Sequence, residues 1–132
     1  MNIEIDEFVP CLKEAETGKI YETEVKVVPS ASLSKYSKSN GWTINWDKTP
    51  EEMTVLGVYI KGENEPQGLI AIRKDKGGVY LSNASTAPQN NKEMNNGKQK
   101  YVGVGGHLFA AAVQESVKSG NLTGLRLWIC GK

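Results

Sequence analysis

The sequence predicts an α+β fold, a mixed α/β layer in which an antiparallel meander precedes a glycine-led helix and one further strand. Stretches in which apolar and polar residues alternate, or apolar residues run together, predict the meander strands at Val55–Ile60, Gln67–Arg73 and Val79–Ala84. Turn residues separate them at Glu63–Pro66 and Asp75–Gly78. Apolar residues spaced three and four apart predict the helix, on a face made of Leu108, Phe109, Ala112, Val113 and Val117.

The remaining segments give weaker signals. Tyr21–Val28 alternates and predicts an earlier strand, which Pro29 closes. We expect a short helix or a docked arm within Met1–Gly18, a loop or irregular helix at Ser30–Asn40, and one or two helical turns starting at Thr49–Glu52. Gly124–Cys130 predicts the final strand, so the expected order is strands, long loop, helix and strand.

Composition limits the classes of function. The chain has 132 residues, which suits a single domain, and its net charge of +1 argues against generic nucleic-acid binding. No apolar run approaches the roughly 20 residues of a membrane span, and the N-terminus lacks the pattern of a signal peptide. A single histidine and two isolated cysteines, Cys11 and Cys130, provide no zinc-ligand set. We therefore expect a cytoplasmic protein with reduced thiols and no bound metal.

The residues before the predicted helix carry the main functional signal. Gly103, Gly105 and Gly106 stand where the helix begins, and a helix N-terminus offers unpaired amides and a partial positive charge to an anion such as phosphate. A tight turn that uses the conformational freedom of glycine explains the same residues about equally well. The spacing fits neither a dinucleotide fingerprint, which needs glycine at Leu108, nor a P-loop, which needs Gly-Lys-Ser/Thr.

Two tryptophans form a second candidate site. Trp42 and Trp46 stand four residues apart and could line a binding pocket. Burial in the core is the interpretation we favour, because tryptophan is mostly buried by packing alone.

The glycine stretch resembles the coenzyme A signature of GNAT-type N-acyltransferases, which reads Arg or Gln, two residues, Gly, one residue, and Gly or Ala. Lys100-Tyr-Val-Gly103-Val-Gly105 fits this pattern with lysine in the basic position. The wider run Tyr101–Ala112 is similar to the form found in bacterial GNAT-like proteins. The expected order of elements over Val55–Cys130 also matches the central part of that fold.

The resemblance implies acetyl-coenzyme A as the cofactor and transfer of its acetyl group to an unidentified primary amine, a small molecule or a peptide. Lys100 would lie near the phosphates, and the acceptor would enter beside Trp42 and Trp46. Coenzyme A would lie in a wedge between the last meander strand and a parallel final strand, with backbone around Ser82, Asn83 and Ala84 pairing with the pantetheine arm. The amides that face the pyrophosphate would come from Val102, Gly103, Val104, Gly105, Gly106 and His107.

The chain also departs from the family. A complete GNAT domain continues with another helix, which commonly supplies a tyrosine acid, and with two more strands, whereas this sequence ends at Lys132. We can name no catalytic residue, because Ser82 and Asn83 lack a suitable pKa and a water relay would be needed. His107 is expected to contact solvent or a phosphate, with its pKa lowered by the positive helix end, more than to act as a base. Cys130 is expected to fill the core.

Three functions stay open from the sequence. The first is an acetyltransferase that is truncated at the C-terminus. The second is a non-catalytic GNAT-like module that acts through coenzyme A binding or protein contacts. The third is an unrelated α+β binding domain whose glycines only make a turn. An unpaired final strand could also join two copies into a homodimer.

Overall fold

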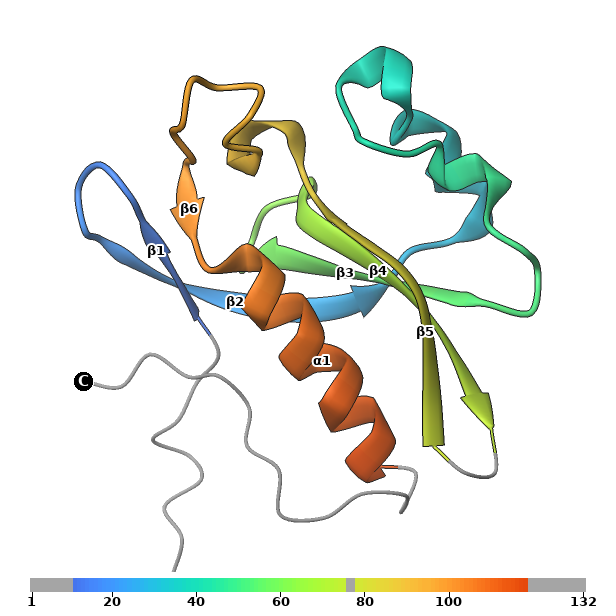
Figure 1. Cartoon of the computed structure of the whole chain (residues 1–132). Coiled ribbons are helices and arrows are strands. Elements are labelled where there is room, and N and C mark those ends of the chain that lie inside the picture. Colours follow the sequence, from blue (N-terminus) through green and yellow to red (C-terminus); the bar gives the residue numbers. More distant parts are fainter. Residues whose placement is uncertain (1–10, 76–77, 119–132) are drawn as a thin grey trace, which may run out of the picture.

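The computed structural model describes residues 11–75 and 78–118, which form a curled, six-stranded antiparallel sheet and a helix (Figure 1). The sheet has the order β5-β4-β3-β2-β1-β6, and every neighbouring pair is antiparallel. This arrangement confirms the α+β class and the meander, whereas the predicted final strand lies outside these residues. The elements are β1 (Cys11–Glu14), β2 (Ile20–Val27), β3 (Thr54–Ile60), β4 (Pro66–Asp75), β5 (Gly78–Thr86), β6 (Tyr101–Val102) and α1 (Val104–Lys118).

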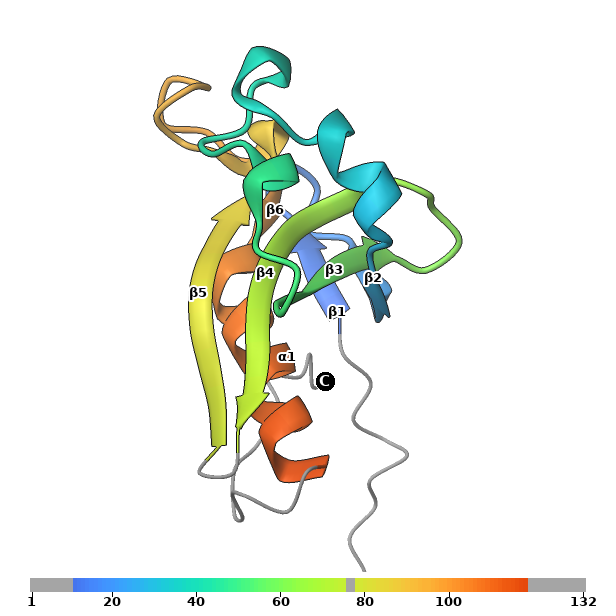
Figure 2. The same cartoon turned by 90° about the vertical axis from the view of Figure 1, so that its right-hand side faces the viewer.

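Both faces of β3 and β4 are covered, so their side chains divide between two cores. Leu56, Val58 and Ile70 belong to the core beneath α1. Val55 and Leu69, which alternate with them, belong to a core on the opposite face. Figure 2 shows the two covering layers on either side of β4. Burial on both faces explains why these strands read as nearly continuous apolar runs.

Helix α1 packs against β5, β4 and β3. Leu108 and Ala112 are 1% and 2% exposed, as the apolar face predicts. Phe109 was wrongly assigned to that face, because its side chain is 59% exposed, whereas Ala111 is buried in its place. The small alanines allow the helix to approach the sheet closely, so the buried face is centred on alanine and not on the larger Phe109. The side chain of Val117 lies outside the description.

The second layer consists of short 3₁₀ turns at Ser30–Lys35, Lys38–Asn40 and Trp46–Lys48. The irregular helix expected at Ser30–Asn40 is therefore confirmed. The helix start expected at Thr49–Glu52 is wrong, because the chain makes only a turn there. The Thr49 hydroxyl donates a 2.7 Å hydrogen bond back to the Trp46 carbonyl, so Thr49 ends the preceding turn and caps no new helix.

The two short strands β1 and β6 were not predicted. β1 lies within the Met1–Gly18 segment, where the sequence suggested a short helix or an arm, and residues 1–10 lie outside the description. A tight turn joins β1 to β2, with Gly18 at a φ of 74° and the Glu14 amide donating to the Lys19 carbonyl. β6 pairs with β1 immediately before α1 begins. Strands this short contain too few residues to show an alternation of apolar and polar side chains.

Cys11 is disulfide-bonded in the structure. The expectation of reduced thiols is therefore wrong for this residue, and the other cysteine of the sequence, Cys130, lies outside the described residues. Disulfides are rare in reducing cytosol and common in oxidising compartments. A cytoplasmic location therefore stays a prediction, and the disulfide bond of Cys11 argues against it.

Candidate functional site at the head of the helix

Gly103 makes the turn that starts α1. Its φ of 81° lies in the left-handed region that side-chain-bearing residues rarely adopt. The Gly103 carbonyl accepts a 3.0 Å hydrogen bond from the His107 amide, which is the first bond of the helix. At this glycine the turn explanation is correct. The same bond occupies the His107 amide, so the prediction that this amide faces a phosphate is wrong.

Gly105 needs a different explanation. A Cβ atom added to Gly105 would meet nothing within 4 Å, so packing does not require glycine there. Gly105 and Gly106 are exposed, and with Val104 they contribute the first-turn amides that lack partners within the helix. The head of α1 therefore presents main-chain donors that a ligand can approach closely. Val102, by contrast, is half-buried and paired with Lys13 of β1.

A buried amide network fixes the chain just before this turn. Asn90 and Gln67 are 4% and 3% exposed, which is uncommon for such side chains. Asn90 Nδ2 donates to both the Gln67 carbonyl and Gln67 Oε1 at 3.0 Å, and Gln89 Nε2 donates to Gln67 Oε1 at 2.9 Å. The Tyr101 amide donates to Asn90 Oδ1 at 2.8 Å. The network thus anchors β6 to the start of β4 and sets where α1 begins.

Strand β5 forms one end of the described sheet, close to the helix head. A Cβ atom added to Gly68 would meet Val104 Cγ1 at 2.8 Å and the Ser85 carbonyl at 3.3 Å, which places the end of β5 beside the first helical residue. The ladder is irregular, because Ala71 pairs with Asn83 whereas Ile72 pairs with Leu81. Ser82 is therefore the extra residue of a β-bulge, whose backbone groups leave the regular ladder.

The three residues expected to meet the pantetheine arm all lie at this irregular edge. Ser82, Asn83 and Ala84 are exposed, and Asn83 Nδ2 donates a 3.3 Å hydrogen bond to Ser82 Oγ. On the helix, exposed Phe109 follows Gly105 and Gly106 by one turn and so shares their side of α1. The head of α1 and the bulge offer polar main-chain groups to a ligand. Phe109 adds apolar surface.

Lys100 lies on the other side of β6 from the helix head. Its side chain is exposed, and its Nζ lies 5.6 Å from the centre of the Tyr101 ring. With Lys92 and Lys98 it lines a polar cleft of about 900 Å³ between the loop before β6 and Glu14–Glu16. Its predicted role beside a phosphate stays a prediction.

His107 faces the core, so the expected contact with solvent or phosphate is wrong. The side chain is 2% exposed, and Nε2 lies 2.6 Å from the hydroxyl of buried Thr23 on β2. Burial lowers the pKa of His107, whereas the sequence argument attributed a lowered pKa to the helix end. A neutral imidazole that joins α1 to β2 has a structural role.

Because of His107, the protein should become less stable as the pH is lowered. Its pKa is lower in the folded state than the ordinary 6.5, so below about pH 6.5 the unfolded chain binds a proton that the native state resists. The free energy of unfolding should be constant above that pH and then decrease by up to about 1.4 kcal/mol per pH unit. Urea denaturation between pH 7.5 and 5.5 measures this, and His107→Gln, which removes the chain's single histidine, should flatten the profile. An equal pH dependence in both proteins would contradict the assignment.

Both tryptophans are core residues. Trp46 is fully buried and Trp42 is 7% exposed, so the favoured interpretation is correct and the acceptor-binding role is not available to their rings. Trp42 packs edge-to-face with Tyr36 at 5.4 Å between ring centres. Trp46 Nε1 donates a 3.1 Å hydrogen bond to Ser85 Oγ, which joins the layer of 3₁₀ turns to the end of β5. Burial also raises the pKa of Tyr36 to about 12, so its hydroxyl stays protonated.

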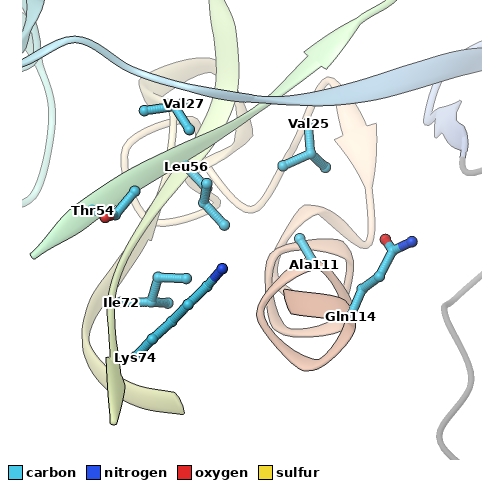
Figure 3. A pocket seen from close by; sticks show the side chains of 8 residues that line it. All are labelled: Val25, Val27, Thr54, Leu56, Ile72, Lys74, Ala111 and Gln114. Carbon is cyan, nitrogen blue, oxygen red and sulfur yellow. The ribbon is translucent and has the colours of Figure 1, made fainter. Parts of the chain in front are cut away.

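A second cleft, of about 310 Å³, lies between α1 and the sheet, away from the helix head (Figure 3). Apolar side chains from β2, β3, β4 and α1 form most of its walls, with polar groups from Thr54, Lys74 and Gln114. The apolar members are Val25, Val27, Leu56, Ile72 and Ala111.

Comparisons with protein-family models, with curated proteins and with solved structures found no match. In the described part of the chain, no helix is long and apolar enough to cross a membrane. Within those same residues, no three His, Cys, Asp or Glu side chains gather into a group that could hold a metal ion.

Proposed function

We propose that the chain is a GNAT-like protein that binds acetyl-coenzyme A and transfers its acetyl group to a primary amine. The observation that carries the proposal is the exposed head of α1, where Gly105 leaves open space in front of first-turn amides that packing does not explain. Exposed amides at a helix N-terminus suit a pyrophosphate. The motif from Lys100 to Gly105 supports coenzyme A over other phosphate ligands.

The order of elements in the described chain supports the same proposal. A strand, a layer of short helical turns, an antiparallel meander and a glycine-led helix follow one another, with the turns and α1 on opposite faces of the sheet. The end of β5 reaches the helix head, so one extended ligand could contact both. In this arrangement the bulge at Ser82 would place irregular main-chain groups beside the pantetheine arm.

In the proposed reaction, acetyl-coenzyme A supplies an activated acyl group as a thioester. The chain would mainly position two reactants: the amides of Val104, Gly105 and Gly106 hold the phosphates, and Phe109 provides apolar contact. A main-chain N–H at the Ser82 bulge is the group best placed to stabilise an oxyanion. The described part of β5 contains no carboxylate and no histidine, so proton transfer from the amine would pass through water.

That lack of a base on β5 favours a second candidate function, a non-catalytic module that binds coenzyme A. A homodimer and a cytoplasmic location also remain predictions, since the final strand on which the dimer was argued lies outside the described residues.

Gly105→Ala should weaken binding of acetyl-coenzyme A at least tenfold while making the fold more stable. Its methyl group would enter the open space where the phosphates are proposed to lie, whereas alanine favours a helix over glycine by up to about 1 kcal/mol. Isothermal titration calorimetry measures the affinity, and urea denaturation measures the stability. Gly105→Leu should abolish binding with the fold intact, and unchanged affinity in both variants would refute the phosphate site.

Turnover separates the candidate functions. Release of free coenzyme A in the presence of a panel of primary amines supports the acetyltransferase. Binding without turnover supports the non-catalytic module. Absence of binding by the unaltered chain would leave an α+β domain of another function.

A further inference from the structure

The polar cleft of about 900 Å³ lies between the loop that precedes β6 and the turn that joins β1 to β2 (Figure 1). Its volume falls within the range of small-molecule sites, about 300–1,000 Å³. The loop and the turn are joined where the Ala15 amide donates a 2.8 Å hydrogen bond to the Lys100 carbonyl. The charged side chains that line the cleft are Lys92, Lys98 and Lys100 of the loop, and Glu14 and Glu16 of the turn. The cleft therefore has a basic side and an acidic side.

The backbone of the loop brings two of the lysines together. The Gly97 amide donates a 2.7 Å hydrogen bond to the Lys92 carbonyl, so the chain turns back and Lys98, the next residue, begins beside Lys92. The turn uses left-handed backbone at Asn96 and Gly97, with φ of 57° and 83°. Among the described residues, Asn96 is the one non-glycine residue with a positive φ, which is an uncommon conformation even though asparagine tolerates it. A turn that places two like charges near each other gains electrostatic energy when an anion lies beside both.

Side-chain amides fix the shape of this loop. Asn91 Oδ1 accepts hydrogen bonds from the Glu93 and Met94 amides, at 2.9 and 3.3 Å. Asn95 Nδ2 donates to the Pro88 and Asn91 carbonyls, both at 2.7 Å. Glu93 belongs to the same loop but does not line the cleft. The backbone that carries the lysines is therefore preformed, and a ligand would not have to order it.

The opposite charges of the two sides do not pair with each other. Among residues 11–75 and 78–118, no ion pair joins a lysine of the cleft to Glu14 or Glu16, and both ion pairs use glutamates of β2. On the acidic side, Glu14 Oε1 accepts a 2.7 Å hydrogen bond from the Thr17 hydroxyl, which orients the carboxylate and keeps its negative charge. The cleft therefore offers ammonium groups on one side and carboxylates on the other to a ligand that carries both charges.

We propose that this cleft binds a small zwitterion, namely an amino acid with an acidic side chain. Its ammonium group would lie against Glu14 and Glu16, and its two carboxylates would lie against the lysines of the loop. Lys92, Lys98 and Lys100 outnumber the two glutamates by one, so a ligand with one more negative than positive charge complements the cleft. This inference is independent of the proposed function, because the cleft lies on the other side of β6 from the helix head.

Titration of the full chain with L-glutamate, followed by two-dimensional NMR of the backbone amides, tests the proposal. The amides of Glu16, Gly97 and Lys98 should shift in a saturable manner, and the amide of Gly105 at the helix head should not. Glutarate, which lacks the ammonium group, and L-lysine, which has the opposite net charge, should each bind about tenfold more weakly than L-glutamate. Affinity should also fall as sodium chloride is added, because the site is exposed to solvent.

Substitutions on the two sides of the cleft separate the two charges of the ligand. Lys98 and Glu16 are exposed, so either can be changed with the fold intact. Lys98→Gln and Glu16→Gln should each weaken L-glutamate binding about fivefold, whereas only Lys98→Gln should weaken the binding of glutarate. Lys48→Gln and Glu51→Gln make the same changes of charge at exposed positions outside the cleft, and these matched controls should leave the affinity unchanged.

Three results would overturn the proposal. Equal binding of L-glutamate and glutarate would show a site for anions only. Amides of the cleft that do not shift at millimolar L-glutamate would show that the cleft binds no such ligand. Equal losses in Lys48→Gln and Lys98→Gln would show a long-range effect of net charge and no site in the cleft.

Discussion

Replacing Trp46 by alanine should lower the free energy of unfolding by about 3–5 kcal/mol, a large part of the roughly 5–15 kcal/mol that stabilises a typical domain. Trp46 is fully buried at the centre of the core between the 3₁₀ turns and the sheet. The substitution leaves a cavity and removes the donor that bonds to Ser85 Oγ. Urea denaturation followed by circular dichroism measures the loss.

Trp46→Phe serves as the matched control. It keeps most of the buried apolar surface and removes the indole N–H, so its cost should be nearer 1–2 kcal/mol. If alanine costs no more than phenylalanine, the tryptophan does not fill the core and the proposed role of a ligand-lining residue becomes available again.

Gly68→Val should displace α1 and lower the free energy of unfolding by about 1–3 kcal/mol or more. An added Cβ at Gly68 would lie 2.8 Å from Val104 Cγ1 and 2.9 Å from Leu108 Cδ1, and both of these residues are buried. The helix head would have to move away from β4, and with it from the neighbouring end of β5. Affinity for acetyl-coenzyme A should fall with the stability, since the proposed site spans both elements.

Gly105→Ala provides the contrast for this prediction, because an added Cβ there has open space around it. The two glycines should therefore give opposite changes in stability and the same direction of change in affinity. A Gly68→Val protein as stable as the unaltered chain would show that α1 does not pack against β4 at this point.

The strands and the start of the helix could be predicted from the sequence because their signals are local. Alternation and turn residues located β2 to β5, and three glycines located the head of α1. The face of the helix could not be predicted from residue size, since Ala111 is buried and Phe109 is exposed. Ala111 is buried because the helix packs closely against a curled sheet, where a small side chain fits. That contact belongs to the tertiary structure and is not visible in the local sequence.

The candidate site was predictable only in part for the same reason. The sequence placed Gly105 at an exposed helix end, but it also placed His107 there, and the histidine faces Thr23 in the core. The bulge at Ser82 and the buried amide of Asn90 depend on pairing with distant residues. A polar Asn-rich stretch is typical of a loop, and nothing in the pattern indicates which of its asparagines, Asn90, becomes buried.

Ser85 links the two faces of the sheet, because its hydroxyl bonds to Trp46 and its carbonyl lies close to the position where a Gly68 side chain would meet the first turn of α1. An indole held in an apolar site reports small changes in its surroundings through the intensity and wavelength of its emission. Trp46 is therefore an intrinsic optical reporter on the face of the sheet opposite α1, connected through Ser85 to the strand end that borders the helix head.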